Sequence, residues 1–180
     1  MLVRVKLPLI AAISLLTVFV DQATKSLAAQ HLIRGEVHSY LFDTVRIVYA
    51  ENIGAFLGLG GHLSSGARFW VFVVLVGLFL LGLVAYALFS RELNRPSVVA
   101  LALLFAGGLS NFYDRLVNNG AVIDFLNVGV GPLRTGVFNG ADMAIMLGLL
   151  FLIFYRPRPP CPDCIHRYVT FRGLFNGGLP

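Results

Sequence analysis

Long apolar runs without a charged residue constrain the fold of this chain most strongly. The sequence is uncharged from Phe69 to Ser90 and again from Pro96 to Tyr113. A helix needs about 20 mostly apolar residues to cross a bilayer, so each run predicts a membrane span. The hydrophobic share of 57% and the charged share of 13% exclude an ordinary soluble domain, in which about 45–50% and about 25% are typical.

Two further apolar runs are bounded by an aspartate. The run that starts at Leu7 stops at Asp21, and the run that ends at Tyr155 begins after Asp142. Each reaches spanning length only if the helix includes its aspartate. We therefore predict an all-α membrane protein with four transmembrane helices, over residues 7–24, 69–90, 96–113 and 137–155.

Basic residues near the spans predict the orientation, because cytoplasmic loops carry an excess of Lys and Arg. Four spans place both termini on one side, where eight basic residues fall: Arg4, Lys6, Arg91, Arg95, Arg156, Arg158, Arg167 and Arg172. The opposite side has six over longer segments: Lys25, Arg34, Arg46, Arg68, Arg115 and Arg134. We therefore predict cytoplasmic termini, with a membrane domain over residues 1–155 and a cytoplasmic tail over 156–180. The formal charge of +5 reflects this topology and requires no nucleic-acid partner.

The two outer segments, residues 25–68 and 114–136, contain the remaining structure. Residues 44–50 alternate apolar and polar side chains, which is typical of a strand, and the glycines that follow indicate loops. In the second outer segment a turn signal at 118–120 precedes an apolar stretch, 121–126, whose one carboxylate is Asp124. We predict a small extracytoplasmic β element with a loop over the site.

Four carboxylates gather at the outer interface on this topology: Asp21, Asp114, Asp124 and Asp142. If the fourth span starts near Val137, Asp142 lies about five residues, or roughly 7 Å, inside the helix. Ionisable groups at that depth are expensive and indicate a functional site.

Helical spacing predicts polar contacts around these carboxylates. Asp21 and Lys25 are four residues apart, on one helix face, and can form an ion pair. Asn111 and Arg115 have the same spacing, and Asn139 and Asp142 are three apart. Each helix thus directs a small polar cluster inward, because a lipid-facing polar group would lack partners.

Asp124 and Asp142 are the candidates for a catalytic pair, since their surroundings are apolar. Lys25 is placed to hold Asp21 ionised, and Arg115 to hold Asp114 ionised. Two carboxylates in one low-dielectric pocket share a proton. One then acts as a base toward water and the other as an acid toward a peptide carbonyl. The dipole at a helix N-terminus favours an ionised Asp142, which leaves the proton on Asp124 more often.

Other chemistries have weaker signals. The histidines lack ligand spacing for a zinc protease, and a Ser110 nucleophile with Lys25 as base has no supporting spacing. Cys161-Pro-Asp-Cys164 resembles half of a zinc knuckle, but a structural zinc site needs four ligands. We expect no metal site.

Five motifs in order resemble the lipoprotein signal peptidase (signal peptidase II) family. They are Asp21-Gln-x-Thr-Lys25, Asn52-x-Gly54-Ala55-Phe56, Gly107-Gly108-x-x-Asn111-x-x-Asp114-Arg115, Gly120-x-Val122-x-Asp124-Phe125 and Phe138-Asn139-x-Ala141-Asp142. The Gly54-Ala55-Phe56 segment is one residue shorter than is usual in the family, and Met143 stands where a small polar residue is common. Both departures concern the substrate-facing loop.

The resemblance implies a monomeric aspartyl endopeptidase of the bacterial inner membrane, without a cofactor. It implies cleavage of diacylglyceryl-modified prolipoproteins before the lipid-modified cysteine, by Asp124 and Asp142. The supporting positions that it implies are Asp21, Lys25, Asn52, Gly54, Asn111, Asp114, Arg115, Asn139 and Ala141.

Two other functions stay open at this point. A small proton-coupled transporter also uses buried carboxylates, but it needs access from both sides, and the inner halves of the predicted spans have no ionisable residue. A non-catalytic relative could bind lipoproteins without cutting them. Proton-driven flux in vesicles without proteolysis would identify a transporter, and turnover in a cleavage assay would exclude a non-catalytic relative.

Overall fold

The computed structural model of the chain describes residues 1–55 and 59–155. The predictions for Phe56 and for residues 156–180, including Cys161 and Cys164, fall outside the described residues. The elements are α1 (Val3–His31), β1 (Val37–Tyr40), β2 (Val45–Asn52), α2 (Ser65–Phe69), the π-helix η2 (Trp70–Leu75), α3 (Val76–Phe89), α4 (Arg95–Val117), β3 (Val122–Val130), β4 (Leu133–Arg134) and α5 (Gly140–Phe154).

Within the described part of the chain, three helical stretches are long and apolar enough to cross a membrane: α1, the continuous stretch Ser65–Phe89, and α4. The predicted spans 7–24, 69–90 and 96–113 lie on these stretches. The helices α1 and α4 continue well past the predicted ends of their spans at residues 24 and 113. Both extensions contain buried charged side chains, Lys25 in α1 and Asp114 in α4. A search for uncharged runs ends a predicted span before such residues.

The start predicted for the fourth helix is wrong. Residues before Gly140 are extended, and Phe138 forms a β-bridge with Leu126, so α5 has 15 residues and Asp142 is its third. Asn139 is the N-cap, with its side chain accepting a hydrogen bond from the Asp142 amide. Apolarity cannot distinguish an extended apolar approach from a first helical turn, which explains the error.

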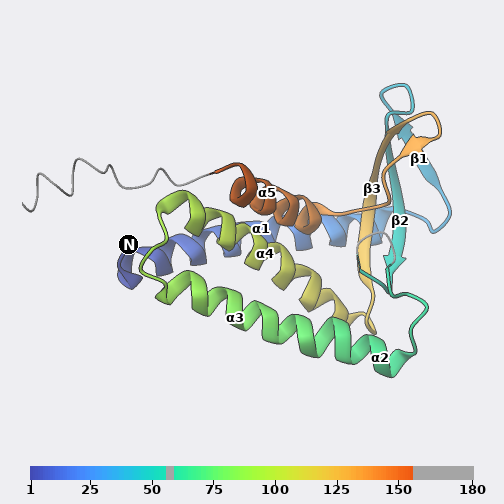
Figure 1. Cartoon of the computed structure of the whole chain (residues 1–180). Helices are drawn as coiled ribbons and strands as arrows, with labels where there is room; N and C mark the ends of the chain where they lie inside the picture. Colours follow the sequence, from blue (N-terminus) through green and yellow to red (C-terminus); the bar gives the residue numbers. More distant parts are fainter. Residues whose placement is uncertain (56–58, 156–180) are drawn as a thin grey trace, which may run out of the picture.

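The helices form a bundle around α4, which contacts α1, α3 and α5 (Figure 1). A cluster of buried apolar residues joins α1, α3 and α4: Ile10, Ala87, Val98, Leu101 and Ala102. At Gly107, α4 and α5 approach so closely that an added Cβ would lie 2.4 Å from the Ala141 carbonyl oxygen. Close helix packing is therefore the role of this glycine.

Gly107→Ala is expected to destabilise the protein by about 1–3 kcal/mol, because the backbone of α5 must move to admit the methyl group. Gly82→Ala in α3 is the matched control, since nothing lies within 4 Å of its added Cβ, and it should be neutral or stabilising by up to about 1 kcal/mol. Thermal unfolding in one detergent measures both. Equal stability of the two variants would refute the close contact.

Lys6 is fully buried at the end of the bundle opposite the sheet. Its Nζ donates to the carbonyl oxygen of Ala87 at 3.0 Å and also to that of Ser90. A cation at a helix C-terminus satisfies carbonyls that lack intrahelical partners, so Lys6 joins the start of α1 to the end of α3. The predicted first span, residues 7–24, left Lys6 outside the helix, whereas α1 includes it.

The four strands form one antiparallel sheet in the order β1-β2-β3-β4, which lies across one end of the bundle (Figure 1). The predicted strand at 44–50 corresponds to β2, and the apolar stretch 121–126 lies on β3. Pairing of β2 with β3 places Asn52 opposite Val122 and Ala50 opposite Asp124. The two outer segments thus meet, and Asp124 and Asn52 come to the end of the sheet over the helices.

Candidate active site

Asp124 is held on β3 by two side-chain amides. It is 2% exposed, its Oδ1 accepts from Asn139 Nδ2 at 2.6 Å, and its Oδ2 accepts from Asn52 Nδ2 at 3.2 Å. Asn52 also folds its own loop, since its Oδ1 accepts from the Gly54 amide at 3.0 Å. The carboxylate is therefore oriented by groups from β2 and from the start of α5.

Asp142 lies in the first turn of α5 as part of a capping box. Its Oδ2 accepts from the Asn139 amide at 3.3 Å, while Asn139 Oδ1 accepts from the Asp142 amide at 2.9 Å. Its Oδ1 accepts from Asn111 Nδ2 of α4 at 2.8 Å. One residue, Asn139, thus bonds both to Asp124 and to Asp142, which joins the two carboxylates through a single fixed side chain.

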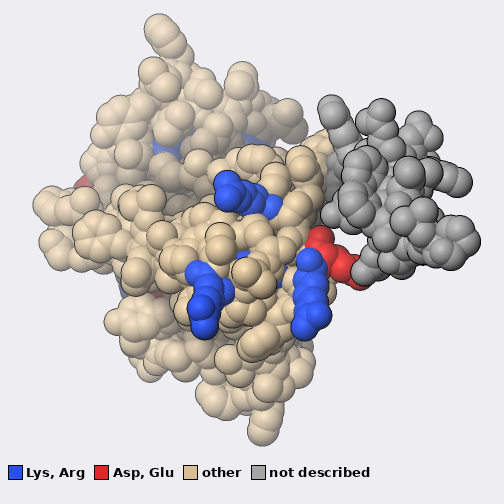
Figure 2. Space-filling model, turned by 90° about the vertical axis from the view of Figure 1, so that its left-hand side faces the viewer, with Lys and Arg blue, Asp and Glu red and all other residues tan. Residues whose placement is uncertain are grey.

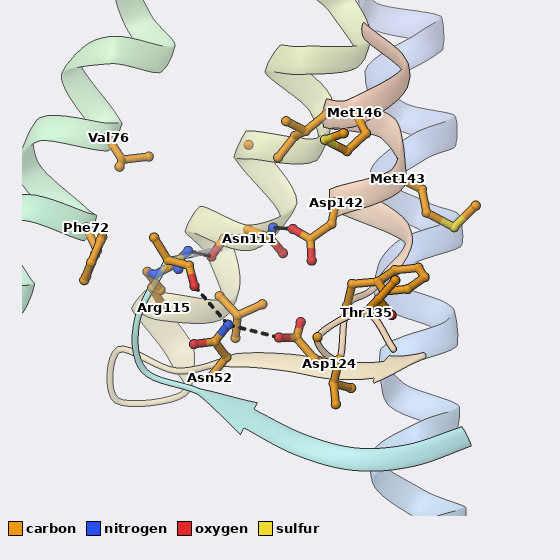
Figure 3. A pocket seen from close by; sticks show the side chains of 17 residues that line it. Asn52, Phe72, Val76, Asn111, Arg115, Asp124, Thr135, Asp142, Met143 and Met146 are labelled. Atoms are coloured by element: carbon orange, nitrogen blue, oxygen red, sulfur yellow. Dashed lines mark hydrogen bonds between the residues drawn. The ribbon is translucent and has the colours of Figure 1, made fainter. Parts of the chain in front are cut away.

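Both carboxylates line one cavity of about 450 Å³. Figure 3 shows Asp142 pointing into it from the helix and Asp124 from the strand. The remaining wall is largely apolar, with Phe72 and Val76 on one side and Met146 on the other. This arrangement places two acidic groups in the wall of a largely apolar cavity.

The electrostatics of Asp124 differ from those of an ordinary surface carboxylate. Burial, and next the neighbouring Asp142 carboxylate, raise the pKa of Asp124 to about 6, although hydrogen bonds from Asn52 and Asn139 act in the opposite direction. In residues 1–55 and 59–155 no ion pair includes Asp124 or Asp142. A proton on Asp124 near neutral pH is therefore accessible for chemistry.

Behind the cavity, Lys25 joins the other two aspartates. Its Nζ lies 2.7 Å from Asp21 Oδ2 and 2.8 Å from Asp114 Oδ2, and it donates to Asn111 Oδ1 at 2.8 Å. All three charged side chains are at most 2% exposed. Lys25 is thus engaged by two carboxylates, which removes the free amine that a serine–lysine mechanism would use.

The predicted pairing of Asp21 with Lys25 is confirmed, whereas the predicted pairing of Asp114 with Arg115 is wrong. Asp114 faces α1, bonding to Lys25 and accepting from Gln22 Nε2 at 2.7 Å. Adjacent residues on a helix point about 100° apart, so Arg115 faces elsewhere. Spacing within one helix could not reveal a partner on another helix.

Arg115 fastens the loop after β2 to α4. Its Nη2 donates to the Gly54 carbonyl oxygen at 2.7 Å, and Nη1 donates to the Asn111 carbonyl oxygen at 3.3 Å. The guanidinium lies over the Phe72 ring, 5.4 Å from its centroid, a favourable cation–π geometry. Arg115 therefore lines the cavity and positions two of its walls.

The nine residues that the sequence predicts to support the site fall into three groups. Asn52, Gly54 and Arg115 form the loop contact, and Asn111 and Asn139 hold the two cavity carboxylates. The third group is behind them: Asp21, Lys25, Asp114 and Ala141. Asp21 contacts α5, since its Oδ1 accepts a hydrogen bond from the backbone amide of Ala141 at 2.8 Å, and Ala141 is fully buried.

Sequence reasoning missed two members of this network, Gln22 and Ser110. Ser110 is fully buried, donates to Asp21 Oδ2 at 2.7 Å and accepts from Gln22 Nε2 at 2.9 Å. The available signal was position, because Gln22 lies inside the first motif and Ser110 directly precedes the motif residue Asn111. Polar side chains inside predicted spans also need partners.

Comparisons with known proteins place the chain in a family. The family model described as "Signal peptidase (SPase) II" matches residues 13–156. The chain is 34% identical to a lipoprotein signal peptidase of Staphylococcus haemolyticus, over 83% of this chain and 89% of the relative. It is 32% identical to one of Borrelia hermsii, over 77% and 83%.

A solved structure described as a bacterial membrane enzyme superposes with a TM-score of 0.71 at 29% sequence identity, covering 81% of this chain and 85% of that one. A second structure with the same description gives a TM-score of 0.70 at 28% identity. The match thus extends over the bundle and the sheet. Taken with the family match over most of the sequence, these findings establish that the chain belongs to the signal peptidase II family.

Proposed function

We propose that this member of the signal peptidase II family is an aspartyl endopeptidase in which Asp124 and Asp142 form the catalytic pair. One observation carries the proposal: these two carboxylates face a common cavity without an ion-pair partner among the described residues, whereas Asp21 and Asp114 both form ion pairs with Lys25. Catalytic acids and bases need a titratable proton near working pH. Asp21 and Asp114, each engaged by Lys25 behind the cavity, serve as supports.

The proposed mechanism uses the two carboxylates in opposite protonation states. Asp142, at the positive end of the α5 dipole, takes a proton from water, whose oxygen attacks the scissile carbonyl. Asp124 donates its proton to the carbonyl oxygen. As the tetrahedral intermediate collapses, the proton on Asp142 passes to the leaving nitrogen and the carbonyl re-forms, returning a proton to Asp124.

The substrate that we propose is a diacylglyceryl-modified prolipoprotein, cut before its lipid-modified cysteine. The names of the relatives support the substrate class, and the apolar walls of the cavity suit an apolar signal peptide. Both aspartates come from one chain, so a monomer suffices. Incubation of purified protein with lipidated and unlipidated precursor, followed by mass spectrometry of the products, tests the substrate and the bond cleaved.

We further propose that the domain over residues 1–155 spans the inner membrane four times, with α5 as the short fourth span. Both termini and the tail at 156–180 would be cytoplasmic, and the sheet and the cavity would lie at the outer face. Figure 2 supports this orientation, because Lys and Arg side chains gather on the end opposite the sheet. Arg4, Arg91 and Arg95 are exposed at that end.

The raised pKa of Asp124 predicts a protonated carboxyl group below pH 6 that ionises as the pH rises through about 6. Infrared spectroscopy should show the carbonyl band of a carboxylic acid that disappears over this interval and is missing in Asp124→Asn. The folded pKa lies above the ordinary 3.8, so the stability contributed by this group is present at low pH and is lost through about pH 6. If the carboxylic-acid band were unchanged in Asp124→Asn, the proton would lie on a group other than Asp124.

A further inference from the structure

The turn between β1 and β2 presents two large apolar side chains to its surroundings. Leu41 is 72% exposed and Phe42 is fully exposed. Nearby, Val130 at the end of β3 and Leu133 at the start of β4 are 73% and 83% exposed. We call these four residues the apolar tip of the sheet. Burial of such side chains is favourable, so the tip offers an apolar surface for contact.

The backbone of the tip adopts an unfavourable conformation, and hydrogen bonds stabilise it. Leu41, Phe42 and Asp43 have φ angles of 52°, 53° and 65°, a left-handed region that bulky residues rarely occupy. The turn is closed by the Thr44 amide donating to the Leu41 carbonyl oxygen at 3.1 Å. The Gly129 amide of β3 donates to the Thr44 carbonyl oxygen at 2.9 Å, which ties the two turns together.

Charged groups at the base of the tip are paired with each other. Asp43 accepts from Arg46 Nε at 2.7 Å, and its carbonyl oxygen accepts from Arg134 Nη1 at 2.7 Å. The hydrogen bond from Arg46 and that from Ser39 lower the pKa of Asp43, so the carboxylate stays ionised. Two arginines against one aspartate leave one positive charge beside the apolar side chains.

The position of the tip indicates what it contacts. In Figure 1 the hairpins carrying it extend past the bundle on the side of α5, at the end of the helices where the sheet lies. Exposed apolar side chains continue along α5 itself, including Leu147, Phe151 and Phe154. In the proposed topology that face of α5 meets lipid, and the tip overhangs the adjoining membrane surface.

We propose that the apolar tip inserts into the interfacial layer of the outer leaflet and anchors the sheet to the bilayer. Aromatic and apolar side chains beside a positive charge are the chemistry that this layer favours. A partner protein fits less well, because a stable interface uses about 20–30 residues a side. The proposal rests on the proposed membrane topology. Since β2 and β3 also carry Asn52 and Asp124 at their other end, the anchor would maintain the height of the catalytic carboxylate above the membrane.

Tryptophan quenching in nanodiscs tests the anchor. The chain has a single tryptophan, Trp70, which is 64% exposed on η2 and which reports whether that helix is in lipid. Trp70→Phe then allows a probe at the tip, Phe42→Trp, whose exposed position tolerates the change. Glu36→Trp in the same background is the control, since Glu36 is exposed and precedes β1, whose start lies on the side away from the helices (Figure 1).

The nanodiscs contain phosphatidylcholine with or without bromine near the carbonyl end of the acyl chains. We expect the emission of the Phe42→Trp variant to shift to shorter wavelength and to lose most of its intensity in brominated lipid. The Glu36→Trp control should change little. Both results together would support insertion of the tip.

Three other outcomes would count against the proposal. An unquenched Phe42→Trp variant, with Trp70 quenched in the wild-type chain, overturns the anchor and leaves the topology standing. An unquenched Trp70 contradicts the topology itself. The emission of the Phe42→Trp variant could also shift to shorter wavelength with rising protein concentration and not respond to bromine. That result would identify a second copy of the chain as the partner and would contradict the proposal.

Discussion

Asp124→Asn and Asp142→Asn are each expected to lower kcat for cleavage of a lipidated precursor by about 10²–10⁴-fold or more. Asparagine matches aspartate in size and can still accept from Asn139 and from Asn111, so the fold should survive. It can neither hold the shared proton nor take one from water. Because the two carboxylates act as a unit, the double variant should be little worse than either single one.

Glu92→Gln is the matched control for these variants. It removes one carboxylate from the exposed end of the bundle opposite the sheet, and it should leave kcat unchanged. Multiplicative losses in the double variant, with folding intact, would contradict a shared role. They would mean that the two aspartates act in separate steps.

Lys25→Met is expected to destabilise the protein by about 3–5 kcal/mol. The substitution leaves the carboxylates of Asp21 and Asp114 buried without their cation, and breaking a buried ion pair by removing one partner has an effect of this size. Thermal or denaturant unfolding in detergent measures the loss. Adding Asp21→Asn and Asp114→Asn to the same chain should restore much of the stability, because no uncompensated charge then remains.

Arg34→Met provides the comparison at the surface. Arg34 pairs with Glu51, and their side chains are 70% and 37% exposed, so the ion pair is solvated and contributes about 0–1 kcal/mol. If Lys25→Met were as mild as Arg34→Met, the network behind the cavity would not stabilise the bundle in the way that its burial implies.

Long-range contacts set the limit of prediction from sequence for this chain. The apolar runs predicted the three long helices because hydropathy alone selects segments of that length, and i,i+4 spacing predicted the Asp21–Lys25 pair. The link from Lys25 to Asp114 joins α1 to α4, and no local spacing contains it. The same holds for the Ala141 amide that binds Asp21.

The β element shows the same limit from another direction. Alternation along residues 44–50 predicted a strand, but the partner strand β3 has a burial pattern without strict alternation. Its pairing with β2 is what brings Asn52 to Asp124. The meeting of these two side chains depended on the register of the sheet, which the sequence pattern did not contain.

The most direct test of the central claim compares wild type, Asp124→Asn and Asp142→Asn on one diacylglyceryl-modified precursor in nanodiscs. Mass spectrometry follows the released signal peptide and the mature fragment that begins with the lipid-modified cysteine. The proposed mechanism predicts both products from wild type and uncut precursor from each variant, all three proteins being folded. Cleavage at the wild-type rate by either variant would contradict it.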